Sequence, residues 1–258
     1  MTSAVGRLVL LATERPMVRR LFTETRPGRA LATRFVAGET LDEAVRVARE
    51  LNAGGFRVSL DHLGEHVTGV AQAAAARDDY LACLDRISAD GLDANISVKL
   101  TQLGLGVDDD LAAASLASLA DRAFTASTTV TIDMEESSHT SATVEMYERA
   151  QRAHGNLGVA LQAYLRRSAA DLERLLPLGG HIRLCKGAYL EPVEVAYQGT
   201  GAVASSFDRL VTTLMAAEGT FPAIATHDEE RIRHAKRLAV RRSGPYEFQL
   251  LYGVRGPL

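Results

Sequence analysis

The chain has 258 residues, of which 47% are hydrophobic and 24% are charged, and its formal net charge is −3. This length and composition suit one soluble globular domain with a sizeable core. The charge balance supplies no basic face, so we predict no nucleic-acid partner. Two cysteines, Cys83 and Cys185, lie far apart and outside any CxxC pattern. This argues against a disulfide framework and favours a reducing, cytoplasmic compartment.

Residues 1–55 are predicted to form an N-terminal helical segment. The apolar run at residues 9–12 is too short for a signal-peptide core or a membrane span. Thr40 and Glu43 have the spacing of a capping box, and apolar residues then repeat at helical intervals. We expect this helix to end near Gly55, because glycine after a periodic run commonly terminates a helix.

After residue 55 the sequence alternates between short apolar runs and amphipathic stretches. This alternation favours a parallel sheet with crossover helices, and no linker divides the series. The predicted strands are residues 56–60, 95–98, 129–132, 159–161, 181–184, 222–225 and 246–250. The predicted helices are residues 79–88, 111–123, 141–154, 169–176, 202–218 and 229–238.

Polar residues follow nearly every predicted strand, which selects a (β/α)8 barrel among the α/β folds. Barrel enzymes place their chemistry at the carboxyl ends of the strands, where the side chains converge. Single residues of this kind, such as Ser137 or Asp228, are also explained as helix caps. The whole set indicates a polar pocket: Asp61, His62, Lys99, Asp133, Gln162, Lys186, Thr226, His227 and Gln249.

The sequence leaves a metal site open as an alternative. Residues 62–66 match the HxxEH pattern of some zinc proteases, but that pattern requires a helix, and here it follows a strand and contains glycine. The alternative is a metal-dependent TIM-barrel hydrolase or isomerase that uses His62, His66, Asp133 and His227. Cations at the same rim would repel a metal and suit an anionic ligand instead, so we predict no metal. These cations are Lys99, Arg183 and Lys186.

Seven motifs, taken together in order and spacing, resemble those of the bacterial proline dehydrogenases. They are residues 61–65, 96–100, 132–135, 161–165, 182–189, 225–228 and 246–253. The resemblance implies a flavoenzyme of proline catabolism that oxidises L-proline to Δ1-pyrroline-5-carboxylate by hydride transfer to FAD. It also implies that the electrons pass to a quinone, which would require peripheral contact with the inner face of the membrane.

The resemblance further implies which residues contact FAD. Arg183 would lie close to the flavin and stabilise negative charge on the reduced ring. Gln162 would hydrogen-bond the edge of the isoalloxazine, and glycine at 187 would permit a close approach of the backbone. The complete cofactor-binding set implied is Met134, Gln162, Arg183, Lys186, Gly187, Ala188, Thr226, His227 and Gln249.

The resemblance assigns the substrate side to three residues. Lys99 and Asp133 would form a polar pair beside the proline, with Lys99 also meeting the substrate carboxylate. Asp133 would orient the substrate amine, and Tyr189 would cover one face of the proline ring. Asp133 and Arg183 are the implied catalytic residues. The alternative for the first pair is a salt bridge that only satisfies two buried charges.

The sequence departs from the family pattern at its C-terminal end. The family continues with an eighth strand and a helix that carries an arginine pair. We therefore expect residues 56–258 to form a barrel that lacks its last β/α unit. A truncated, inactive FAD-binding relative remains the second alternative. Arg241 and Arg242 precede the seventh strand, so they are not assigned the role of that pair.

Overall fold

The computed structural model of the protein describes residues 35–64 and 66–254. Residues 48–249 form one compact unit, and the described residues 35–47 and 250–254 belong to a second. The sheet and every predicted site residue lie in the first unit. Helices predicted before residue 35 lie outside the described residues. The proposed domain boundary between residues 55 and 56 stays a prediction.

Among the described residues, seven parallel strands form a single sheet in sequence order. Each begins within two residues of its predicted start. The strands are β1 (Val58–Asp61), β2 (Ala94–Val98), β3 (Val130–Ile132), β4 (Leu157–Gln162), β5 (Gly180–Cys185), β6 (Thr220–Ala225) and β7 (Glu247–Gln249).

A helix follows each strand from β1 to β6, and α4 precedes β1 in the described part of the chain. The bounds are α4 (Leu41–Ala53), α5 (Val70–Asp90), α6 (Asp109–Thr125), α7 (Ser137–His154), α8 (Ser168–Leu175), α9 (Thr200–Ala216) and α10 (Glu229–Ala239). A short 3₁₀ helix, η1 (Leu176–Leu178), extends α8. No helix within residues 35–64 and 66–254 has both the length and the apolar composition that a membrane crossing requires.

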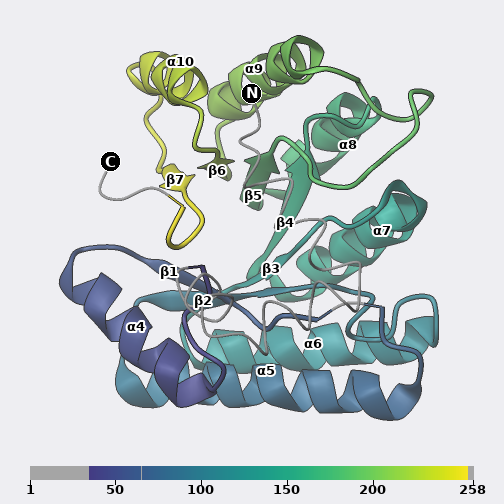
Figure 1. The fold of residues 1–258 in the computed structure, drawn as a ribbon, viewed down its shortest axis with the longest axis vertical. Coiled ribbons are helices and arrows are strands. Elements are labelled where there is room, and N and C mark those ends of the chain that lie inside the picture. The colour runs from purple at the N-terminus through teal and green to yellow at the C-terminus, as the bar shows by residue number, and fades with distance from the viewer. Residues whose placement is uncertain (1–34, 65, 255–258) are drawn as a thin grey trace, which may run out of the picture. The chain divides into compact units, whose positions relative to one another are not determined.

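Within residues 48–249 the sheet is curled, and helices α5 to α10 lie along its outer side (Figure 1). Strand order equal to chain order, with a helix in every crossover, is the arrangement of a (β/α)8 barrel. The predicted fold class is therefore confirmed. In such a barrel the carboxyl ends of the strands face one rim, and that rim carries the polar residues singled out above.

Local sequence signals explain where the helices begin and end. At the start of α4, Glu43 N donates to Thr40 Oγ1 at 3.3 Å and Thr40 N donates to Glu43 Oε2 at 3.2 Å, so the predicted capping box is confirmed. Asp228 caps α10, as predicted, by accepting from the backbone N–H groups of the first turn. Ser137 does not cap α7; it is the first helical residue, after Glu136.

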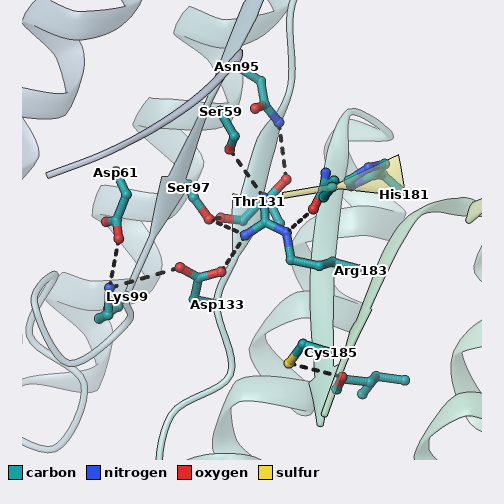
Figure 2. A network of polar contacts seen from close by, with 12 residues as sticks. Ser59, Asp61, Asn95, Ser97, Lys99, Thr131, Asp133, His181, Arg183 and Cys185 are labelled. Atoms are coloured by element: carbon teal, nitrogen blue, oxygen red, sulfur yellow. Dashed lines mark hydrogen bonds and ion pairs between the residues drawn. The ribbon is translucent and has the colours of Figure 1, made fainter. Parts of the chain in front are cut away.

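The strands present alternating residues to two different environments. One set is apolar and fully buried against the outer helices, as at Ile96, Ile132 and Ile182. On β1, β2, β3 and β5 the residues between them are mostly polar and face the inside of the curled sheet (Figure 2). Since successive side chains of a strand point to opposite faces, this pattern places a polar interior beneath the rim. That interior is the candidate site.

Candidate active site

Arg183 of β5 occupies the centre of the polar interior (Figure 2). Its Nη1 donates to Asp133 Oδ1 at 2.6 Å and to Ser97 Oγ at 2.7 Å. Its Nε donates to Gln249 Oε1 at 2.6 Å, and its Nη2 donates to Ser59 Oγ at 3.2 Å. One guanidinium therefore joins residues on or directly after β1, β2, β3 and β7, and its forked donors hold it in one orientation.

Lys99, directly after β2, lies between two carboxylates. Its Nζ is 3.1 Å from Asp61 Oδ2 and 3.9 Å from Asp133 Oδ2, so Asp61 is the nearer partner. Desolvation by burial raises the pKa of Asp61 above its ordinary value, although the charge of Lys99 opposes that shift. Asp61 also lies 3.4 Å from the hydroxyl of Tyr80. The result is a row of alternating charges across the rim: Asp61, Lys99, Asp133 and Arg183.

A second polar layer lies nearer the amino ends of the strands. His181 Nε2 of β5 is 3.0 Å from Glu247 Oε1 of β7, and Gln249 Nε2 donates to the same oxygen at 2.6 Å. Burial alone would raise the pKa of Glu247, but its interaction with His181 holds that pKa below the ordinary value. This layer ties β5 to β7 beneath Arg183.

Gln162 at the end of β4 is buried and fixed by backbone groups. Its Nε2 donates to the carbonyl of Glu135 at 2.8 Å, and its Oε1 accepts from Ala188 N at 3.4 Å. The side chain of Glu135 is itself buried and accepts from both the hydroxyl and the N–H of Thr101. Burial raises the pKa of Glu135, with the Thr101 hydrogen bonds opposing the shift. These contacts join the loops that follow β2, β3 and β5.

The loop after β5 contains the predicted residues 186–189. Gly187 has φ +108°, and a Cβ there would lie 2.1 Å from Cδ1 of Tyr164, so only glycine lets the backbone pass this ring. Lys186 Nζ donates to Asp228 Oδ2 at 2.6 Å. Burial alone would raise the pKa of Asp228, but the hydrogen bond and charge of Lys186 hold it below the ordinary value. Tyr189 is half-buried in the same loop.

The structure brings the predicted residues together in two groups. Lys99, Asp133, Arg183 and Gln249 belong to one continuous network, whereas Gln162 and Ala188 meet at a neighbouring edge. Three further predicted residues lie just after strand ends: Met134 two positions after β3, and Thr226 and His227 directly after β6. The ligand-binding roles of all these residues stay predictions.

Each rim cation has a carboxylate partner, which differs from the expectation of a cationic rim. Lys99 and Arg183 share Asp133, and Lys186 is paired with Asp228. The physical reason is that charges withdrawn from water must be compensated. An incoming anion would therefore meet oriented hydrogen-bond donors within a locally balanced set of charges.

Four residues that the sequence reasoning missed belong to the same site. Asp61 was recognised only as a polar strand end, Glu135 was considered only as a possible metal ligand, and Ser59 and Ser97 were given no role. The available signal was the two-residue alternation of polar positions within the strands, because Ser59 and Asp61 share one face of β1. Glu135 had no such signal, since it follows β3 in a loop.

The alternative metal set does not come together. His62 Nδ1 lies 3.6 Å from the carboxylate of Asp79 on α5, and Asp133 is held by the rim cations. Residues 62–64 and 66 do not form a helix, so the zinc-protease pattern lacks the geometry it requires. Glu65 lies outside the described residues. His66 meets a different pair of residues, Glu136 and His139.

Comparison with known proteins decides the family. A family model described as proline dehydrogenase matches residues 44–258. The chain is 35% identical to proline dehydrogenase 1 of Bacillus subtilis subsp. natto over 227 residues, covering 87% of this chain and 75% of the relative. It is 34% identical to the proline dehydrogenase of Deinococcus radiodurans over 260 residues, covering 98% and 83%.

The chain belongs to the proline dehydrogenase family. The predicted family is confirmed, and with it the enzyme class, an oxidoreductase acting on proline. A crystal structure of proline utilization A from Bdellovibrio bacteriovorus superimposes with a TM-score of 0.82 at 22% identity, which supports the fold. The match covers 96% of this chain but only 32% of that much longer protein.

Proposed function

We propose that this proline dehydrogenase is FAD-dependent and oxidises L-proline to Δ1-pyrroline-5-carboxylate, with a quinone as the electron acceptor. The network around Arg183 carries this proposal, because it fixes Lys99 and Asp133 side by side at the carboxyl ends of β2 and β3. One cation and one carboxylate at that spacing suit a substrate that carries a carboxylate and an amine. A cytoplasmic site of action with peripheral membrane contact belongs to the same proposal.

The residues at the rim have chemistry that fits a flavin. An isoalloxazine edge needs hydrogen-bond donors and acceptors, which the amides of Gln162 and Gln249 supply. A phosphate or ribityl chain needs cations and exposed backbone, which Lys186 and Ala188 supply. Arg183 would stabilise negative charge on the reduced ring. When bound, FAD supplies the acceptor for the hydride that leaves the proline carbon next to nitrogen.

The chain's own residues would act mainly by positioning. Lys99 would pair with the substrate carboxylate, and Asp133 would orient the amine. Arg183 holds Asp133 through a 2.6 Å hydrogen bond, so the carboxylate cannot rotate away as the substrate enters. Tyr189 would cover the ring and exclude water. Fixing the reacting carbon in this way removes much of the entropic barrier to the transfer.

An absorbance spectrum of the purified protein, followed by anaerobic addition of L-proline, tests the proposal. We expect a flavin band that bleaches on addition of proline and is restored by a quinone analogue. A colourless protein that gains no flavin band with added FAD would overturn the cofactor assignment. A flavin band that proline leaves unchanged would instead indicate the inactive relative.

A further inference from the structure

Two histidines and a glutamate gather where the loop after β1 meets the start of α7. The ligand atoms of His66, Glu136 and His139 all lie within 4.8 Å of one another. His66 lies in the loop between β1 and α5, whereas Glu136 and His139 belong to the start of α7. We propose that these three residues form a binding site for a divalent transition metal ion, with Zn²⁺ the best fit.

The contact between His66 and Glu136 has the separation of two ligands of one ion. His66 Nε2 lies 3.2 Å from Glu136 Oε2. That oxygen is buried, yet it accepts no hydrogen bond of acceptable geometry within the described part of the chain. Two ligand atoms that each lie about 2.1 Å from a tetrahedrally coordinated ion are about 3.4 Å apart. The pair therefore sits at a coordinating distance without the alignment of a hydrogen bond.

Helix geometry places the other two ligands together. Glu136 is the N-cap of α7 and His139 lies three residues later, so both side chains reach the same side of the first turn. Gly106 packs against the imidazole: a Cβ there would lie 3.7 Å from Cε1 of His139. Since all the ligand atoms lie within 4.8 Å of one another, the widest pair must close by at most about 1.4 Å to meet a tetrahedral ion, a movement within the reach of side-chain rotation.

Outer contacts hold the backbone of His66 in place. His66 has φ +55°, a left-handed conformation that non-glycine residues rarely adopt. Its N–H donates to Thr101 Oγ1 at 3.1 Å, and that hydroxyl donates in turn to the buried carboxylate of Glu135. Supporting hydrogen bonds of this kind orient metal ligands. They also place a carboxylate behind the site.

The identity of the ligands selects the metal class. Two imidazoles and one carboxylate suit Zn²⁺, whereas Ca²⁺ and Mg²⁺ prefer oxygen ligands only. Three protein ligands leave a fourth position for water or an anion. The site is separate from Lys99, Asp133 and Arg183, and it departs from the prediction of no metal made from the sequence.

Titration of the tag-free, chelator-treated protein with Zn²⁺ in the absence of proline tests the inference. We expect one equivalent to bind, measured by elemental analysis after gel filtration and by competition with a chromophoric chelator. Co²⁺ bound in place of Zn²⁺ should give visible absorption bands that are typical of an ion with a low coordination number. Loss of a residue that only supports a metal ligand typically costs about tenfold to hundredfold in affinity. His139→Gln and Glu136→Gln each remove a ligand itself, so each should weaken binding by at least that factor.

His62→Ala is the matched control, because His62 lies in the same loop but faces Asp79 instead. Affinity should be unchanged in this variant. Circular dichroism establishes that each variant is folded, and Glu136→Gln preserves size in case His139→Gln does not fold. Absence of stoichiometric binding to the wild-type protein would overturn the inference, as would equal affinity in the His139, Glu136 and His62 variants.

Discussion

Arg183 is the residue on which the geometry of the proposed site depends most. Its side chain is only 14% exposed, and its donors meet acceptors on or beside four other strands. A lysine at this position would keep the charge but would present a single donor atom without a fixed fork. The interior of the barrel therefore uses one guanidinium where many barrels use layers of apolar side chains.

Replacing Asp133 with asparagine should separate charge from shape at this site. The amide oxygen of the variant can still accept from Arg183, so the fold should be retained. We expect proline turnover to fall by on the order of a hundredfold, because misplacing the reacting groups by about 1 Å can cost that much. Steady-state kinetics with an artificial electron acceptor measure the effect. Asp121→Asn, at an exposed position on α6, is the control. Wild-type turnover in Asp133→Asn would refute the assigned role.

The sequence predicted the composition of the rim but not its pairings. The position of Lys99 after an apolar strand placed it at the rim, and the motif around it suggested Asp133 as its partner. The structure shows Asp61 closer, at 3.1 Å. Which carboxylate lies nearer depends on the stagger between β1, β2 and β3, and no local sequence signal encodes that stagger. The grouping of His66, Glu136 and His139 was also not predicted, because it depends on how the loop after β1 meets the start of α7.

At the scale of elements, a residue from a distant loop supplies the cap of α7. The N-cap residue, Glu136, makes no capping hydrogen bond with its own side chain. Instead, Ser137 N donates to Glu191 Oε1 and Ser137 Oγ donates to Glu191 Oε2, both at 2.6 Å. A carboxylate is favourable at the positive end of a helix. Glu191 thereby fastens the loop after β5, which carries Tyr189, to the loop after β3.

Glu191→Ala should lower the free energy of unfolding by about 1 to 2 kcal/mol, the usual cost of losing a helix cap. It should also expose the loop after β5 to proteases. Urea denaturation and limited proteolysis measure the two effects. Glu194→Ala, an exposed position in the same loop, is the matched control and should change neither quantity. Equal stability of both variants would show that the capping contact is unimportant.

Most elements could be predicted because their residues carry local signals. All seven strands and the six helices between them were located, since β-branched runs and helical periodicity were clear. The largest error is at α5, which starts at Val70 although the prediction began at residue 79. Its first turns are rich in alanine, which favours helix but gives no apolar periodicity. The preceding Gly69 makes no side-chain cap that could have marked the start.

At the scale of the whole described sheet, the contact between His181 and Glu247 links β5 to β7 across the intervening β6. The pKa of Glu247 is lowered in the folded state. Its ionised carboxylate therefore contributes its full stabilisation above the ordinary value of 4.5, and this contribution is lost as the pH falls through the lowered pKa. Unfolding measured between about pH 3 and pH 6 should show that dependence in the wild type. The pH dependence of stability should be weaker in Glu247→Gln. Identical pH profiles of the wild type and the variant would contradict the assigned role of the Glu247 carboxylate.

The two thiols report whether residues 48–249 unfold as one unit. Cys83 lies on α5 and Cys185 ends β5, and burial raises the pKa of each to about 11. Against an ordinary value of 9.0, a rise of about two units lowers the thiolate fraction near neutral pH by about a hundredfold. Both thiols should therefore react slowly with a disulfide reagent until the protein unfolds. Each thiol can be measured alone in the variant that lacks the other, Cys83→Ala or Cys185→Ala. Both should become reactive at the same urea concentration, because α5 and β5 belong to the same compact unit. Two distinct midpoints would show that the first strands and the later strands of the barrel unfold independently.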